Sequence, residues 1–253
     1  MHAKCTVLYT MLTAGENEMA KKTLTIEQKK ADIDLYIIIA ITVLVLMIYM
    51  AFQAPISAFA KNPEVHVLIR TLVMAGFEFG VAGLGMTTVM LLRKEGFRSY
   101  GLKKEGALKA IVFSLLMGIP HILFLILTGS FKGYLPFQAV WMTRDVLAGG
   151  FPVNVIGMII IAVVWGFFEG FNYAVISDKI NMRYPSRNRW LNWGAIVCAV
   201  ACILIHGAIG VTPENIIETA TIFMLIYGML MVKAFTGNAW GIVVLFVFLW
   251  NAF

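Results

Sequence analysis

Seven long apolar segments dominate this chain of 253 residues and restrict the folds that are open to it. All but the last are near or above the roughly 17 residues that a helix needs to cross a hydrocarbon core. Backbone groups in lipid must find their hydrogen bonds within the segment, so each segment should be helical. We therefore predict an all-α, polytopic transmembrane helix bundle with spans near residues 35–54, 65–92, 107–128, 153–176, 191–210, 216–232 and 239–253.

The ends and links of these segments define the domain organisation. Residues 1–34 are polar and mixed in charge, which predicts a cytoplasmic N-terminal tail with a short interfacial helix. Met19 in Met19-Ala20-Lys21-Lys22 is an alternative start for the chain. Residues 35–253 form the transmembrane domain, and the stretch Tyr134–Phe151 leaves an eighth, interfacial or re-entrant half-span open.

The composition agrees with a membrane protein and limits the choice of partners. The chain is 60% hydrophobic and 13% charged, whereas a soluble domain carries roughly 25% charged residues. Its net charge of +6 comes from basic residues in short loops, where they set topology. The lipid bilayer is therefore the expected partner, and nucleic acid is not.

The distribution of basic residues predicts the orientation. Of the 20 lysines and arginines, 16 lie on the side of the N-terminal tail and the other four are Lys61, Arg70, Lys132 and Arg144. Because cytoplasmic loops carry the excess of basic residues, we expect a multi-pass protein of the cell membrane with a cytoplasmic N-terminus.

The three cysteines indicate neither a disulfide nor a zinc site. Cys198 and Cys202 are four residues apart in one apolar segment, which is poor disulfide geometry, and Cys5 lies far away in the tail. No Cys-x-x-Cys spacing is present. The sequence therefore predicts no metal ligand and leaves any cofactor unknown.

Six polar residues lie inside the predicted spans: Glu78, His121, Glu169, Asn172, His206 and Asn251. At 1.5 Å per residue they lie about 16–24 Å from the cytoplasmic ends of their helices, so they should share a similar depth. Ionisable residues at such depth are costly and usually functional. A structural alternative remains for some of them, such as a Glu169 that only hydrogen-bonds between helices, or a His121 that binds carbonyls freed by Pro120.

Glu169 is the centre of this set. It lies in the aromatic stretch Val163–Tyr173, and Asn172, three residues later, shares its helix face. A carboxylate, an amide and an imidazole that meet at low dielectric can hold a water. Glu169 would act as base on that water, and His206 would polarise a carbonyl or stabilise an oxyanion.

Four landmarks together resemble the CAAX protease and bacteriocin-processing (CPBP, or Abi) family of intramembrane proteases. They are the basic link that ends in Gly101-Leu102, the glutamate at 169, the histidine of Ala201–His206, and the turn Thr236-Gly237-Asn238-Ala239-Trp240. The resemblance covers the chain from about residue 92 onward. It implies the family's helical core and an intramembrane endopeptidase that cleaves a membrane-associated or prenylated peptide.

The resemblance also implies a set of catalytic residues and identifies where this chain departs from it. Glu169 would be the base and His206 its electrophilic partner, and Asn172, Asn251 or Glu78 would substitute for missing members of the set. The second motif glutamate is Gly170, the motif arginine is Ala174, and the phenylalanine before the histidine is Cys202. The resemblance implies a second histidine near position 246 or 247, but these residues are Phe246 and Val247. Counted from Trp240, Asn251 lies about one residue away from the position of the motif asparagine.

These departures keep two other functions open. One is a catalytically inactive homologue that serves as a membrane binding or immunity protein. The other is a small transporter in which Glu78, Glu169 and His121 form a proton path.

Overall fold

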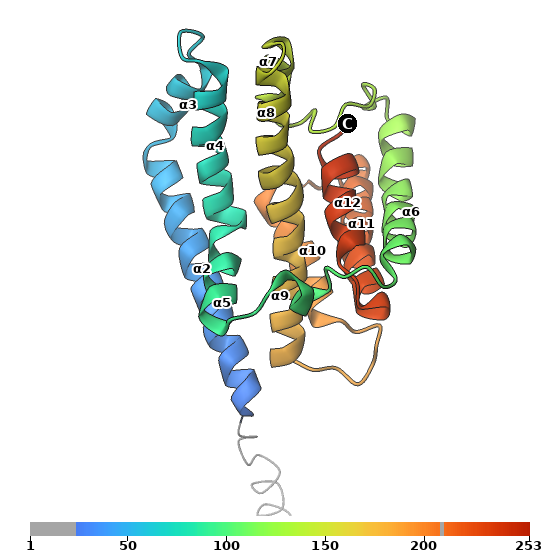
Figure 1. Ribbon diagram of the computed structural model, residues 1–253. Coiled ribbons are helices and arrows are strands. Elements are labelled where there is room, and N and C mark those ends of the chain that lie inside the picture. Colours follow the sequence, from blue (N-terminus) through green and yellow to red (C-terminus); the bar gives the residue numbers. More distant parts are fainter. Residues whose placement is uncertain (1–23, 208–209) are drawn as a thin grey trace, which may run out of the picture.

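The computed structural model describes residues 24–207 and 210–253, and this part of the chain contains helices and no strands (Figure 1). Cys5, Met19 and most of the predicted tail lie outside the described residues. The helices are α2 (Ile26–Ala51), α3 (Gln53–Lys61), α4 (Val67–Ala82), α5 (Leu84–Arg93), α6 (Ala107–Leu127), α7 (Thr143–Ala148), α8 (Val153–Ile161), α9 (Glu169–Arg183), α10 (Trp193–Ile205), α11 (Pro213–Thr236) and α12 (Trp240–Leu245). A 3₁₀ turn, η1 (Phe97–Tyr100), and two π-helical segments, η2 (Ala162–Phe168) and η3 (Phe246–Trp250), complete the elements.

Four helices in the described residues are long and apolar enough to cross a membrane: Ile26–Ala51, Ala107–Leu127, Val153–Arg183 and Pro213–Thr236. The pair α4 and α5 makes a fifth if its 57° bend is counted within one span. The helices Trp193–Ile205 and Trp240–Trp250 are apolar but shorter. The all-α prediction is confirmed, whereas the number of spans that cross the bilayer remains a prediction.

Helix α2 begins at Ile26, nine residues before the predicted start of the first span. Thr25 and Gln28 form a capping box: the Thr25 hydroxyl accepts from the Gln28 N–H at 3.2 Å, and the Gln28 side chain accepts from the Thr25 N–H at 3.0 Å. The boundary placed at residue 34 between tail and membrane domain therefore falls within a continuous helix.

A buried ion network explains why the polar first turns of α2 belong to the fold. Asp34 is 1% exposed, and its carboxylate lies 2.7 Å from Arg93 Nε and 2.8 Å from Lys179 Nζ. Lys179 also lies 3.0 Å from Glu95, which accepts a hydrogen bond from the Tyr100 hydroxyl. Burial, together with that hydrogen bond, raises the pKa of Tyr100, so the phenol stays protonated as a donor. The network joins α2, α5, η1 and α9 at one end of the bundle.

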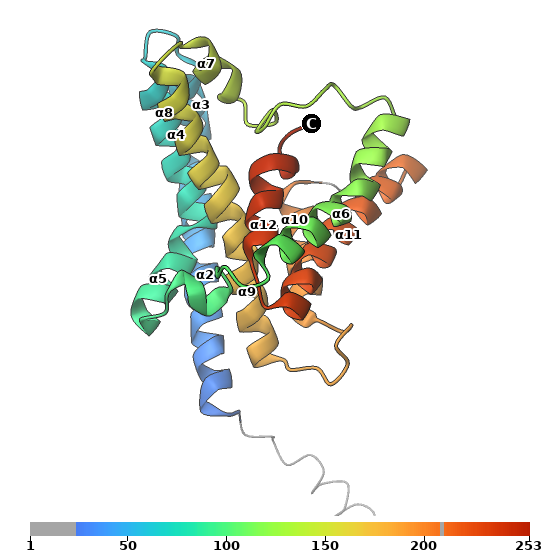
Figure 2. The ribbon, with the colours of Figure 1, turned by 45° about the vertical axis from the view of Figure 1, so that its right-hand side comes forward.

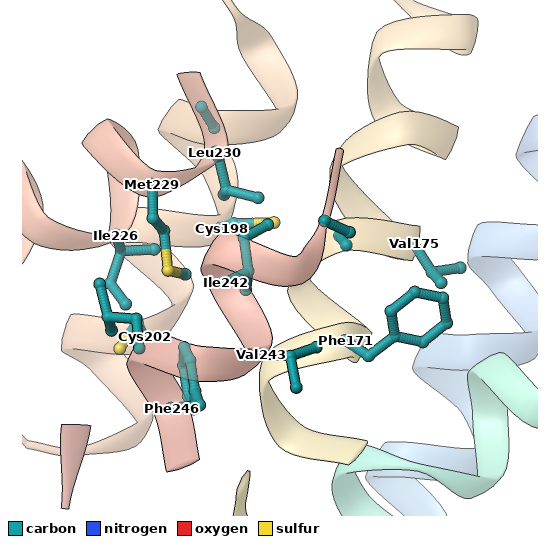
Figure 3. Packing of buried hydrophobic residues seen from close by; sticks show 14 of the residues in the cluster. Phe171, Val175, Cys198, Cys202, Ile226, Met229, Leu230, Ile242, Val243 and Phe246 are labelled. Atoms are coloured by element: carbon teal, nitrogen blue, oxygen red, sulfur yellow. The ribbon is translucent and has the colours of Figure 1, made fainter. Parts of the chain in front are cut away.

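The continuous helix α8–η2–α9 runs through the middle of the molecule (Figures 1 and 2). Helices α2, α4 and α5 pack along one side of it, whereas α6, α11 and α12 lie on the other, and α10 packs against both α9 and α11. The main hydrophobic core fills the space between α9, α10, α11 and α12 (Figure 3). The central helix therefore presents residues to two different groups of neighbours.

The two π-helical segments pack against one another, because glycines in the central helix let η3 approach closely. A Cβ added at Gly166 would lie 2.6 Å from a methyl carbon of Val247, and one at Gly170 would lie 2.9 Å from Cβ of Phe246. This Gly-x-x-x-Gly spacing is typical of tight helix crossings in membranes. π-helical turns occur frequently at functional sites, and η2 ends directly before Glu169.

Candidate functional site

A cavity of about 200 Å³ lies between α2, α4, α9 and α10. Four of the polar residues predicted inside the spans line it, namely Glu78, Glu169, Asn172 and His206. The described residues that line the cavity include no lysine or arginine. Thr42 of α2 donates a hydrogen bond to the Val81 carbonyl of α4 at 2.9 Å and ties two of its walls together.

Glu169 is the first residue of α9, directly after the π-helical segment η2, and is 7% exposed. Its Oε1 lies 3.8 Å from Nε2 of His206. This separation exceeds that of a direct hydrogen bond, and both groups face the cavity, where one water can contact the two of them. The two groups are therefore placed as a base and a partner at one site.

His206 ends helix α10, and its backbone N–H donates to the Cys202 carbonyl at 3.0 Å. Its side chain is 37% exposed, so the imidazole is the accessible member of the pair. The ring packs against the indole of Trp250, with centroids 5.2 Å apart and planes at 33°. Packing on Trp250 restricts the directions in which the imidazole can point.

Asn172 lies one turn after Glu169 and lines the same cavity. Its Oδ1 is buried and has no hydrogen-bond partner among the described residues. Buried polar atoms without partners are rare in native structures and require an explanation. The amide is therefore free to bind a group that enters the cavity.

Two of the polar residues predicted inside the spans lie elsewhere. His121 Nδ1 lies 3.1 Å from the Thr221 hydroxyl, in place of the carbonyls that were expected to bind it. Asn251 does not line the cavity, and its carbonyl accepts a hydrogen bond from the Ala139 N–H at 3.0 Å. The cavity thus brings together three of the four predicted catalytic residues, Glu169, Asn172 and His206, and leaves Asn251 outside.

Sequence reasoning missed Trp250 and Tyr173. Tyr173 lines the cavity, and its ring lies 5.4 Å from that of Phe246. Trp250 packs on His206 from the last turn of η3, one residue before Asn251. A π-turn spans one residue more than an α-turn, which matches the one-residue offset noticed between Trp240 and Asn251.

The departures from the family motif lie against one another. Gly170 occupies the position where the resemblance implies a second glutamate. It contacts Phe246, which occupies one of the two positions where the resemblance implies a second histidine. Phe246 and Ala174 are both fully buried. An apolar contact without room for a longer side chain therefore fills this part of the site.

Comparisons of the chain with protein-family models, with curated proteins and with solved structures gave no match. Within residues 24–207 and 210–253, no group of three or more histidines, cysteines or acidic residues is arranged to hold a metal ion.

Proposed function

We propose that this chain is an intramembrane endopeptidase of the CAAX-protease type, in which Glu169 activates a water. The observation that carries the proposal is the 3.8 Å separation of Glu169 Oε1 and His206 Nε2 at one cavity between membrane-type helices. Glu169 is the general base, and His206 polarises the scissile carbonyl or stabilises the developing oxyanion. In this proposal the bundle crosses the cell membrane with seven or eight spans and has a cytoplasmic N-terminus.

The rim of the cavity supports a substrate that arrives through the bilayer. Ile39 and Val43 of α2 and Val197 and Ile205 of α10 line the cavity and are also largely exposed. Both helices pack along α9, so the opening between them faces the surroundings of the bundle rather than its core. A prenylated or otherwise membrane-associated peptide fits this access, because lipid is the medium at the rim.

Residues other than those of the family motif complete the site. Glu78 reaches the cavity from α4 and supplies the second carboxylate that Gly170 does not. Asn172 lies on the face of Glu169 and serves as a polar contact for the substrate amide or the oxyanion. The site is thus assembled from α4, α9 and the end of α10.

A non-catalytic membrane binding or immunity protein is the second candidate function. The contact of Gly170 with Phe246 favours it, because that contact fills the position of motif residues with apolar atoms. Loss of a single oxyanion donor typically costs about 100- to 1000-fold in turnover. The transporter alternative lacks such support, since His121 binds Thr221 on α11, away from the cavity.

Cleavage of a fluorogenic prenylated peptide by the purified protein in liposomes tests the two candidates. We expect Glu169→Gln and His206→Ala each to lower the rate at least 100-fold at unchanged folded yield. His121→Ala, which changes a histidine outside the cavity, is the matched control and should retain activity. Peptide that binds the wild-type protein without being cleaved would favour the non-catalytic candidate.

A further inference from the structure

Trp250 contacts the candidate site through the ring of His206. It is the last residue of η3, and its indole ring lies 5.2 Å from the His206 imidazole and 5.5 Å from the Phe246 ring. Trp250 does not line the cavity. It therefore acts on the site through His206 and its neighbours rather than by touching substrate.

The indole N–H of Trp250 makes no hydrogen bond to the described residues. Nε1 is buried, and among the described residues no acceptor lies in hydrogen-bond geometry with it. The indole packs on the His206 ring, and Nε2 of that ring lies 3.8 Å from Glu169 Oε1, so the indole and the carboxylate both adjoin the same imidazole. A buried donor beside a buried carboxylate gains most by donating to it, because hydrogen bonds to charged groups are the stronger ones.

The surrounding structure fixes Trp250 at this place. The π-turn of η3 packs on η2, which ends directly before Glu169. Phe246, at the start of η3, is held against Gly170, the residue that follows Glu169. The same helix contact therefore sets the positions of both Glu169 and Trp250.

We infer that Trp250 is a positioning residue that holds both members of the Glu169–His206 pair. Its indole N–H, which has no acceptor among the described residues, is the donor that the Glu169 carboxylate takes up when the site works, and its ring supports the imidazole of His206. The carboxylate is thereby directed toward the water that it shares with His206. The catalytic consequence rests on the proposed peptidase function, whereas the contact itself does not.

Indole ¹H–¹⁵N NMR spectra of the whole protein in detergent micelles test the contact without any substrate. The Trp250 signal is assigned as the one lost in Trp250→Phe. We expect Glu169→Gln and His206→Ala each to shift this signal, while the Trp193 signal stays in place. The matched control His121→Ala should leave the Trp250 signal unchanged. A Trp250 signal that is the same in wild type and Glu169→Gln overturns the inference.

Kinetics with the fluorogenic prenylated peptide test the catalytic consequence. Trp250→Phe keeps a ring on His206 and removes the N–H, so we expect kcat to fall on the order of tenfold, with KM unchanged. Trp250→Ala should lower kcat further. Wild-type cleavage with equal kcat in Trp250→Phe overturns the positioning role. If the wild-type protein does not cleave the peptide, the proposed function fails and the NMR shifts alone decide the contact.

Discussion

At the scale of single residues, Gly170 and Phe246 determine how closely the two π-helical segments approach. Gly170 follows Glu169 in the chain, and the Phe246 ring occupies the space into which a longer side chain would project. The ring also packs on Tyr173 and Trp250, both of which contact the candidate site. A change at Gly170 is therefore transmitted directly to Glu169 and to Trp250.

Gly170→Ala should destabilise the protein by roughly 1–3 kcal/mol, because overpacking forces shifts in a filled core. The added Cβ would lie 2.9 Å from Cβ of Phe246, which cannot move without its backbone. Gly76→Ala is the matched control, since a Cβ at this other helical glycine meets nothing within 4 Å. Thermal unfolding in detergent measures both variants, and equal stability of the two would contradict the tight contact.

The depth of a polar residue along its helix predicts only part of the candidate site. Counting 1.5 Å per residue predicted a common depth for the polar residues, and Glu78, Glu169, Asn172 and His206 do share a cavity. Depth along a helix says nothing about the direction in which a side chain points. His121 therefore bonds Thr221 on another face of the bundle, although its predicted depth equals that of His206.

At the scale of elements, α2 depends on the ion network at its N-terminal half. Most of its apolar side chains are exposed, and in the described helix only Ala31, Asp34 and Ile38 are buried. Asp34 joins it to Arg93 of α5 and to Lys179 of α9. Asp34, which lies in the segment predicted as a tail, is thus an internal contact, and its helix begins before the predicted start of the first span.

Lys179→Met should destabilise the fold by up to about 3–5 kcal/mol, because the buried Asp34 carboxylate keeps only Arg93 as a cationic partner and Glu95 loses its ion pair. Lys179 is 3% exposed and contacts both Asp34 and Glu95. Lys30→Met breaks an exposed pair with Glu27 and should cost at most about 1 kcal/mol. The free energy of unfolding in detergent measures the difference, and a loss no larger for Lys179→Met than for Lys30→Met would refute the role of the network.

The π-helical segments are the elements that the sequence did not predict. Apolar runs indicate helices, but α- and π-turns differ by a single residue per turn and share the same composition. The choice between them depends on the close packing of Gly166 and Gly170 on η3, which is a tertiary contact. Asn251 was predicted in the site from the family resemblance, whereas the structure places Trp250, one residue earlier, against His206.

At the scale of the whole molecule, the basic segments gather at one end of the bundle. The start of α2, the end of α5 and the end of α9 lie together there, whereas α3 and α7 lie at the opposite end (Figure 1). This separation agrees with the alternation of basic and non-basic links in the sequence. It leaves the direction of the bundle in the membrane to be measured.

Labelling with a membrane-impermeant thiol reagent measures the orientation. Cys198 and Cys202 are buried, so in a Cys5→Ser background an introduced cysteine should dominate the signal. We expect Lys132→Cys to react in intact cells and Lys29→Cys to react only after lysis; both positions are exposed. The reverse pattern would contradict a cytoplasmic N-terminus.

A double-mutant cycle on the cleavage rate tests most directly whether Glu169 and His206 act as one unit. The cycle compares Glu169→Gln, His206→Ala and the double variant on the prenylated peptide, with folded yield measured for each. If the two residues act on one water, the first substitution removes nearly all of the cleavage activity. The double variant should therefore be about as slow as the slower single variant. Effects that multiply in the double variant would show that the two residues act independently and would contradict the account.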